Sequence, residues 1–203
     1  MKLIYSPTSP FVRKCMVVAA ELGLVDRIEK VSGTANPVNR DPGIVAVNPL
    51  GQVPTLITDD GQAIHDSRVI CEYLNALGNG GFFPASGTER WEALTNQSMA
   101  DGMLDAALLG RYEMGLRPEE YRWTDWVNGQ VDKIHKGLDM FESRIGDIGG
   151  RLDIGTITLG CTLGYLDFRY PDLGWRDGHP ALAHWYETFS QRPSMQQSAP
   201  PQG

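Results

Sequence analysis

The chain has 203 residues, of which 41% are hydrophobic and 21% are charged, and this length suits one large domain or two small ones. Its formal net charge of -7 and the lack of any run of five basic residues argue against a nucleic-acid-binding surface. No stretch approaches the roughly 18 to 20 apolar residues that span a bilayer. Pro7 and Pro10 interrupt the apolar residues at the start, so no signal peptide is expected. The sequence therefore predicts a soluble cytoplasmic protein with no membrane or nucleic-acid partner.

The cysteines and histidines do not follow the spacing of a metal site. Cys15, Cys71 and Cys161 are far apart in the chain, and each lies inside an apolar pattern of helical period. This placement favours buried free thiols. No CxxC pair occurs and the 4 histidines are scattered, so no metal is expected.

The first part of the chain alternates between strand and helix signals. The apolar run 2–5 predicts a strand, and apolar residues at helical spacing follow it up to Leu22. Residues 27–31 alternate between polar and apolar like a second strand. A loop rich in Gly, Asn, Asp and Pro follows over 32–42, and a short helical turn is expected over 43–47.

A hairpin and a second helix complete this part. Residues 55–58 and 62–65 flank Asp-Asp-Gly at 59–61, which predicts two antiparallel neighbouring strands. A helix should then start with Ser67 as its N-cap and stop at Gly78. The predicted order is βαβ, a loop, then ββα.

The segment 5–14, YSPTSPFVRK, lies where the first strand gives way to the first helix. Ser9 directly precedes Pro10, and proline is favoured at the first position of a helix. Backbone N–H groups are unpaired at this helix end and the helix dipole is positive there, so the position favours an anion. One interpretation makes Ser9 only an N-cap. The other makes its hydroxyl the donor that stabilises a bound thiolate.

Three motifs in this order resemble those of the glutathione transferases. The segment 48–54, NPLGQVP, is similar to that family's NPxGxVP element, and His-Asp-Ser at 65–67 is similar to its (E/D)S element. Ser-Pro-Phe-Val-Arg at 9–13 resembles its active-site segment, in a bacterial type of the family. The resemblance implies a thioredoxin-like α/β domain followed by an all-α domain.

The resemblance also implies which residues would interact with the thiol of glutathione. Ser9 would donate to the thiolate, and Phe11 belongs to the same binding segment. Tyr5 is a rival donor, because some classes of the family use a tyrosine at the end of the first strand. Serine at position 9 stabilises a thiolate but cannot form the mixed disulfide that a cysteine forms there. The expected chemistry is therefore conjugation or another addition of glutathione.

The other two motifs would hold the remainder of glutathione. In the family, Val53 before the cis Pro54 pairs its N–H and C=O with the cysteinyl backbone like an added strand. Gln52 would reach the glycyl carboxylate. Asp66 would meet the γ-glutamyl ammonium and Ser67 the carboxylate, at a helix N-terminus suited to anions. A plain N-cap is the alternative for this last pair.

The second half of the chain has helical patterns throughout. A helix is expected from Trp91, another over 124–145, and a third over the apolar run 157–165. Asp153 and Thr156 occupy the positions of a capping box, but with the residue types of the family exchanged. Because threonine is short and uncharged, this exchange argues against reciprocal capping.

These patterns predict the domain organisation. Residues 1–78 would form the thioredoxin-like glutathione-binding domain, 79–89 a linker and 90–203 the all-helical domain. The chain from Gln191, rich in proline and glutamine, is expected to be extended or disordered.

The second substrate has no recognisable motif, although the family resemblance places it in a cleft between the domains. Each candidate is also explained by interior packing; the candidates are Leu104, Leu108, Arg111, Tyr112, Phe168 and Trp175. The resemblance further implies a homodimer, with contacts near Arg68, Tyr73 and the helix after Trp91.

Two functions follow from these observations. The first is a glutathione transferase that binds glutathione as co-substrate, requires no metal and acts on an electrophilic small molecule. The alternative is a glutathione transferase-like interaction module without turnover. Family members of that kind usually lose the hydroxyl or acidic residues that this chain retains, which favours the enzyme.

Overall fold

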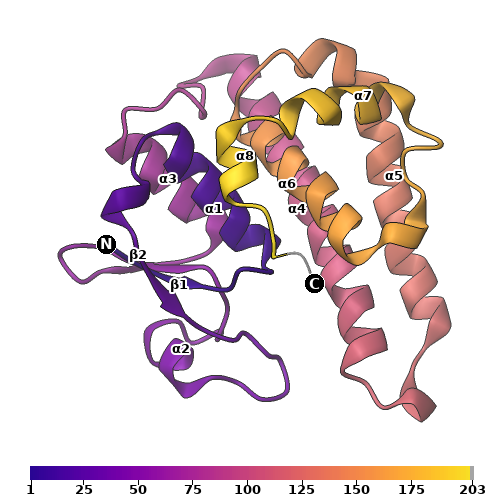
Figure 1. The fold of residues 1–203 in the computed structure, drawn as a ribbon, viewed down its shortest axis with the longest axis horizontal. Helices are drawn as coiled ribbons and strands as arrows, with labels where there is room; N and C mark the ends of the chain where they lie inside the picture. Colours follow the sequence, from indigo (N-terminus) through magenta and orange to yellow (C-terminus); the bar gives the residue numbers. More distant parts are fainter. Residues whose placement is uncertain (202–203) are drawn as a thin grey trace. The chain divides into compact units, whose positions relative to one another are not determined.

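The computed structural model describes residues 1–201 and divides into two compact units (Figure 1). The first unit comprises Met1–Phe83 together with the chain from Arg192 onward, and the second comprises Pro84–Gln191. Among the described residues, no helix is long and apolar enough to cross a membrane.

The first unit is a four-stranded mixed sheet with helices on both faces. The sheet order is β2-β1-β3-β4; β1 and β2 are parallel, and the other two pairs are antiparallel. The thioredoxin-like arrangement predicted from the sequence is confirmed. The strands are β1 (Lys2–Tyr5), β2 (Glu29–Ser32), β3 (Thr55–Ile57) and β4 (Ala63–Ile64), and the helices are α1 (Pro10–Glu21), η1 (Val25–Arg27), α2 (Pro42–Val47), α3 (Ser67–Leu77) and α8 (Pro193–Gln197).

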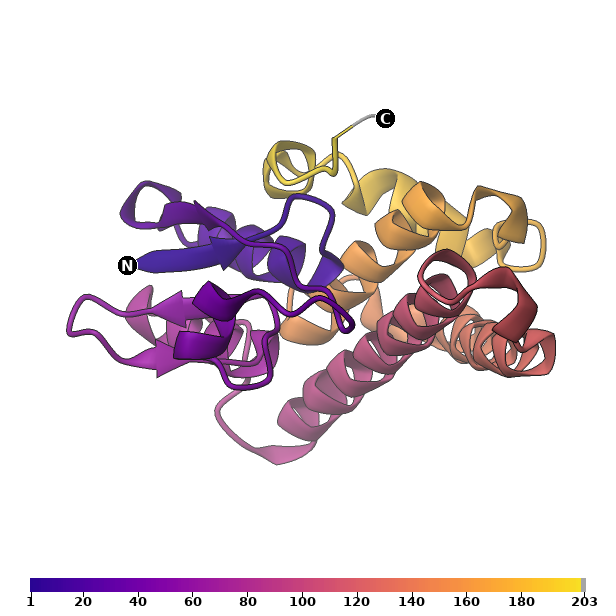
Figure 2. The same cartoon turned by 90° about the horizontal axis from the view of Figure 1, so that it is seen from below.

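Strand β1 is buried on both faces of the sheet. Leu3 and Ile4 are consecutive and therefore point to opposite faces, yet both are buried. Figures 1 and 2 show α1 and α3 on one face and α2 on the other. Ile4 belongs to the α2 side, because a Cβ at Gly33 would lie 2.5 Å from Ile4 and 3.1 Å from Ile44 of α2. The core of this unit therefore has two layers.

The predicted hairpin joins β3 to β4 and is confirmed. Thr58 N–H donates to the carbonyl of Gln62 at 2.9 Å, and Gln62 N–H donates to the Thr58 hydroxyl at 2.9 Å. Gly61 has φ 89°, a left-handed conformation that glycine adopts without steric cost. The turn residues thus set the register of the two strands.

The second unit is all helical, as predicted. Helix α6 forms its centre and is buried from Ile154 to Leu166. It packs against α4, which also packs against α5, and α5 contacts α7. The elements are α4 (Gly87–Gly115), η2 (Glu119–Tyr121), α5 (Thr124–Ile148), α6 (Ile154–Arg169), η3 (Pro171–Leu173) and α7 (Pro180–Phe189).

Helix α6 begins with a complete capping box, so the argument against reciprocal capping was wrong. Thr156 N–H donates to the Asp153 carboxylate at 3.0 Å, and Asp153 N–H donates to the Thr156 hydroxyl at 3.1 Å. The short threonine side chain suffices because the extended backbone at Asp153 brings its own N–H over the first turn. Exchanging the residue types leaves both hydrogen bonds intact.

The segment from Gln191, expected to be extended or disordered, contains a helix; residues 202–203 lie outside the described part of the chain. This short helix, α8, packs against α1 of the first unit. Arg192 donates to both carboxylate oxygens of Glu21, each at 2.9 Å, and the Ser194 hydroxyl donates to the same group. Arg13 donates to the carbonyl of Met195 at 3.0 Å. Contacts with distant residues, which local composition does not encode, therefore order this segment.

The ion pair between Glu21 and Arg192 should contribute measurably to stability. The Arg192 hydrogen bond holds the pKa of Glu21 below the usual value for a glutamate, against the opposing effect of burial. Glu21→Gln should lower the free energy of unfolding at pH 7 by about 1 to 2 kcal/mol, measured by urea unfolding. A lowered folded-state pKa contributes stability above the unfolded pKa, and this is lost as the pH falls through the folded value. The difference between variant and wild type should therefore shrink in acid.

The control for this measurement is Glu29→Gln. Glu29 lies 3.6 Å from Lys2 on the surface, and exposed pairs of this kind contribute about 0 to 1 kcal/mol. Equal stability of Glu21→Gln and wild type at pH 7 would contradict a bracing role for α8.

Candidate functional site

The strand register brings the three predicted motif segments to one end of the sheet. Ile4 of β1 lies opposite Thr55 of β3, and Leu56 of β3 lies opposite Ile64 of β4. Because both pairs are antiparallel, the end of β1, the start of β3 and the end of β4 lie at the same end of the sheet. Neighbouring strands are about 4.8 Å apart, so the segments that follow β1 and β4 are about 10 Å apart, with the 48–54 segment between them. We call this end of the strands the motif end of the sheet.

Ser9 is the N-cap of α1, as one of the two interpretations predicted. Its hydroxyl oxygen accepts a hydrogen bond from Val12 N–H at 3.3 Å, and Pro10 is the first helical residue. Ser9 is partly exposed. The hydroxyl hydrogen of Ser9 has no acceptor within residues 1–201. Capping therefore uses the oxygen and leaves the hydrogen for a further partner.

Asn48 shapes the segment that precedes β3. Its buried amide donates to the carbonyl of Gln52 at 3.2 Å and to the Thr55 hydroxyl at 3.0 Å. Its side-chain oxygen accepts from Leu50 N–H at 3.1 Å. Two of the partners are backbone groups of the loop and the third is the side chain of Thr55 in β3, so one side chain joins the loop to the strand that follows it.

Val53 and Pro54 lie between this loop and β3. The bond between them is cis, as the family resemblance implied. Within the described chain, neither the N–H nor the C=O of Val53 forms a hydrogen bond. Val53 is partly exposed while Pro54 is buried. Val53 therefore offers one donor and one acceptor to an extended ligand.

The N-cap of α3 is Asp66, not Ser67 as predicted. The Asp66 carboxylate accepts from Arg68 N–H at 2.6 Å, and Ser67 is the first residue of the helix. The cap lies one residue earlier because the aspartate side chain reaches the free N–H groups of the first turn. Asp66 is exposed and Ser67 is buried, and the Cys15 thiol of α1 lies 3.8 Å from the Ser67 carbonyl.

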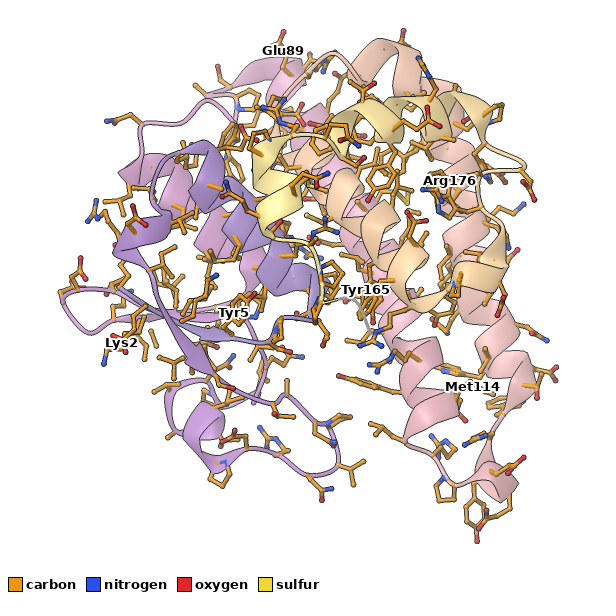
Figure 3. All side chains as sticks on the ribbon, in the orientation of Figure 1. Lys2, Tyr5, Glu89, Met114, Tyr165 and Arg176 are labelled. Atoms are coloured by element: carbon orange, nitrogen blue, oxygen red, sulfur yellow. The ribbon has the colours of Figure 1, made fainter. Side chains whose placement is uncertain are left out.

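The structure also places the remaining candidates of the first unit. Tyr5 ends β1, and the ammonium of Lys30 lies over its ring at 5.0 Å (Figure 3). Phe11 is partly buried in the first turn of α1, and the Gln52 side chain is exposed. Cys15 and its neighbour Cys71, with sulfurs 3.8 Å apart, are buried free thiols, as predicted. Within residues 1–201, no group of three or more His, Cys, Asp and Glu could hold a metal.

The candidates for the second substrate differ in exposure within the helical unit. Leu104 and Trp175 are buried, and Trp175 donates to Asp167 at 2.9 Å, so both belong to the interior. Arg111 is exposed. The remaining three are partly exposed; these are Leu108, Tyr112 and Phe168.

Sequence reasoning missed two side chains of this unit, Tyr165 and Arg169. They lie one turn apart on α6, and the charges of Arg111 and Arg169 both act on the Tyr165 hydroxyl. The available signal was the spacing of four residues between them, which places both side chains on one face of the helix.

Comparison with known proteins agrees with this geometry. A sequence profile described as "Glutathione S-transferase, N-terminal domain" matches residues 8–77, and one described as "Glutathione S-transferase, C-terminal domain" matches residues 124–188. The chain belongs to the glutathione S-transferase family. The first match contains all three motif segments at the motif end of the sheet.

Several relatives resemble this chain along its whole length. A glutathione transferase family member from Pseudomonas fluorescens Pf-5, solved with bound glutathione, is 44% identical with a TM-score of 0.97, and the match covers 99% of each chain. A second structure described in the same words holds S-(propanoic acid)-glutathione, at 44% identity, a TM-score of 0.92 and full coverage of both chains (100%). The uncharacterized GST-like protein YibF of Escherichia coli K12 is 34% identical, with 99% of each chain covered.

The hydrogen bonds of Asn48 predict a large effect of its removal. Asn48→Ala removes three hydrogen bonds and leaves the Leu50 N–H without an acceptor, whereas the Gln52 carbonyl keeps the Thr55 hydroxyl as donor. The variant should lower the free energy of unfolding by roughly 1 to 3 kcal/mol in urea unfolding. Asn48→Asp should restore only part of this loss, because a carboxylate accepts from Leu50 but cannot donate to Gln52 or Thr55. A fully stable Asn48→Ala would show that the loop keeps its shape without the amide.

Proposed function

We propose that this protein is a glutathione transferase that binds glutathione at the motif end of the sheet and activates its thiol for attack on an electrophilic substrate. The observation that carries the proposal is the Ser9 hydroxyl, which caps α1 through its oxygen and keeps its hydrogen available. The 44% identical relative with bound glutathione supports the choice of ligand.

Ser9 would favour the ionised form of the bound thiol. A free thiol has a pKa of about 8.5 and is mostly protonated at pH 7, whereas the thiolate is the nucleophile. The hydroxyl would donate to the sulfur, and the positive end of α1 would act in the same direction. The thiolate then forms a carbon–sulfur bond, and either a leaving group departs with its electron pair or a double bond accepts the electrons and later a proton. Holding the two reactants together supplies much of the rate.

The backbone of Val53 would bind the central residue of glutathione. Its N–H and C=O would pair with the cysteinyl backbone, which extends the sheet by one short strand. An extended tripeptide is about 10 Å long, which matches the span from the end of β1 to the end of β4. The exposed Gln52 would then reach the glycyl carboxylate at one end.

Asp66 and Ser67 would bind the γ-glutamyl end. The exposed Asp66 carboxylate would pair with the ammonium, and the N-terminus of α3 would hold the carboxylate. This arrangement gives each charged end of glutathione a partner at the motif end.

The proposed chemistry is conjugation, not thiol–disulfide exchange. Position 9 has no thiol, and Cys15 lies six residues further along, about 9 Å at 1.5 Å per residue. Cys15 is fully buried between α1 and α3. No cysteine therefore takes the place of a thiol at the helix start.

The Ser9 hydroxyl is tested with variants that separate donation from capping. Ser9→Gly removes the hydroxyl, yet glycine costs a helix cap only a few tenths of a kcal/mol. Conjugation of 1-chloro-2,4-dinitrobenzene should fall by about tenfold for each unit by which the glutathione pKa rises, with glutathione affinity nearly unchanged. The loss should be largest at low pH and vanish above the free-thiol pKa of about 8.5.

Two further variants complete this test. Ser9→Thr keeps the hydroxyl and should retain most of the activity. Ser9→Cys should attack the disulfide of added oxidised glutathione, release one glutathione, and gain a glutathione adduct visible by mass spectrometry. If turnover were unchanged in Ser9→Gly and abolished in Tyr5→Phe, the residue that donates to the thiolate would be Tyr5 and not Ser9.

Asp66→Asn isolates the charge of Asp66 from its capping role. Asparagine caps a helix as well as aspartate, so thermal stability should be nearly unchanged. Loss of a charge-assisted hydrogen bond of about 1.5 to 3 kcal/mol should weaken glutathione binding roughly 10- to 100-fold in calorimetry. Wild-type protein that binds no glutathione at millimolar concentration would refute the proposed function itself.

A further inference from the structure

Helices α4 and α6 run parallel in the helical unit, in a register that hydrogen bonds define. The Thr162 hydroxyl donates to the Ala100 carbonyl at 3.2 Å, and the Tyr170 hydroxyl donates to the Ala107 carbonyl. At the other end, a Cβ at Gly155 would lie 2.7 Å from the Asn96 side chain. The last turn of α6 therefore lies beside the part of α4 around Ala107, about two turns before α4 ends at Gly115.

This register places a group of aromatic and basic side chains together. Arg111 lies one turn beyond Ala107 on α4, while Tyr165 (labelled in Figure 3) and Arg169 lie one turn apart at the end of α6. The guanidinium of Arg169 lies 3.8 Å from the centre of the Phe168 ring. We call Arg111, Tyr165 and Arg169 the arginine–tyrosine cluster.

The two arginines of the cluster have no acidic partner. Within residues 1–201, neither Arg111 nor Arg169 forms an ion pair, and the buried Nε of Arg169 has no hydrogen-bond partner. Arg151 and Arg176 of the same unit are paired with acids: Arg151 lies 2.7 Å from Glu92, and Arg176 donates two hydrogen bonds to Asp167. Arg122 and Arg144 form no ion pair within residues 1–201, but they donate to the Arg117 carbonyl and to Asn96. The buried Nε of Arg169, which has no partner, therefore distinguishes the cluster within the unit.

Two positive charges close together, one partly buried, are unfavourable without an anion. Burial lowers the pKa of Arg169, and the charge of Arg111 lowers it further. Burial raises the pKa of Tyr165, so its hydroxyl stays neutral and able to donate, although both arginine charges oppose that rise. The two guanidinium groups can only donate hydrogen bonds, and the neutral Tyr165 hydroxyl can donate as well as accept.

We propose that the arginine–tyrosine cluster is a binding site for the carboxylate of an organic acid. A guanidinium presents paired N–H groups that match the two oxygens of a carboxylate. The partly exposed Leu108 and Phe168 next to the cluster suit an apolar or aromatic body attached to that carboxylate. If the proposed transferase activity holds, acidic electrophiles are the preferred class of second substrate.

The site is tested by measuring the binding of benzoate, and of benzamide as its uncharged isostere, in the absence of glutathione. Calorimetry or NMR titration measures the binding. Wild type should bind benzoate at least tenfold more tightly than benzamide. Arg111→Gln, at an exposed position that does not endanger folding, and Arg169→Gln should each abolish that preference. Lys136→Gln removes the same charge from an exposed position on α5 and should leave binding unchanged. Equal binding of the two probes, or a preference that survives both arginine variants, would overturn the proposal.

A kinetic arm separates this site from the proposed function. In the conjugation of 4-chloro-3-nitrobenzoate and 4-chloro-3-nitrobenzamide, chloride leaves as the carbon–sulfur bond forms, and the acid should be preferred in kcat/KM. That preference should fall at least tenfold in Arg111→Gln while glutathione affinity is unchanged. Glutathione binding with equal turnover of both compounds would refute the acidic substrate class. A protein that binds no glutathione would refute only the transferase, because the benzoate titration does not depend on it.

Discussion

The hydrogen-bonded register of β1, β3 and β4 is the constraint on which the candidate glutathione site depends. The antiparallel pairs Ile4–Thr55 and Leu56–Ile64 place three chain segments from distant parts of the sequence at one end of the sheet. A slip by one residue would turn the buried Leu56 to the opposite face, so core packing holds this register strongly. The same apolar burial that stabilises the sheet thus positions polar groups that have no direct contact with one another.

At the motif end, the Ser9 hydroxyl would form two interactions with different atoms. Its oxygen caps helix α1, and its hydrogen would be donated to the proposed ligand. The helix needs a lone pair for Val12 N–H, while a thiolate needs the hydrogen, so neither use interferes with the other. Asp66 would have a similar double role, because its carboxylate caps α3 and is exposed to the ammonium proposed to bind it. Stability and binding are therefore linked at helix starts, and variants must be chosen to separate the two.

Local signals predicted most of the first unit, and long-range contacts explain the errors. In the turn at Gly61 and in the segment 48–54, the residue types themselves restrict the backbone conformation, so these features can be predicted without knowledge of distant contacts. Helix α8 was missed because its order comes from Glu21, which lies 171 residues away from Arg192. The N-cap of α3 was misplaced by one residue because Asp66 and Ser67 are both good capping residues, and only the backbone conformation distinguishes them.

In the helical unit, the environment of each arginine depends on which acidic residue lies next to it, and not on the net charge of the chain. The chain has a net charge of -7, yet its carboxylates lie where they neutralise particular arginines, such as Asp167 beside Arg176. Arg111 and Arg169 have no such neighbour, and two like charges remain close together at the cost of repulsion and desolvation. A fold that only needed stability would gain from one acidic residue at this point. An unpaired cluster in an otherwise acidic protein is consistent with a binding site in which the ligand supplies the negative charge.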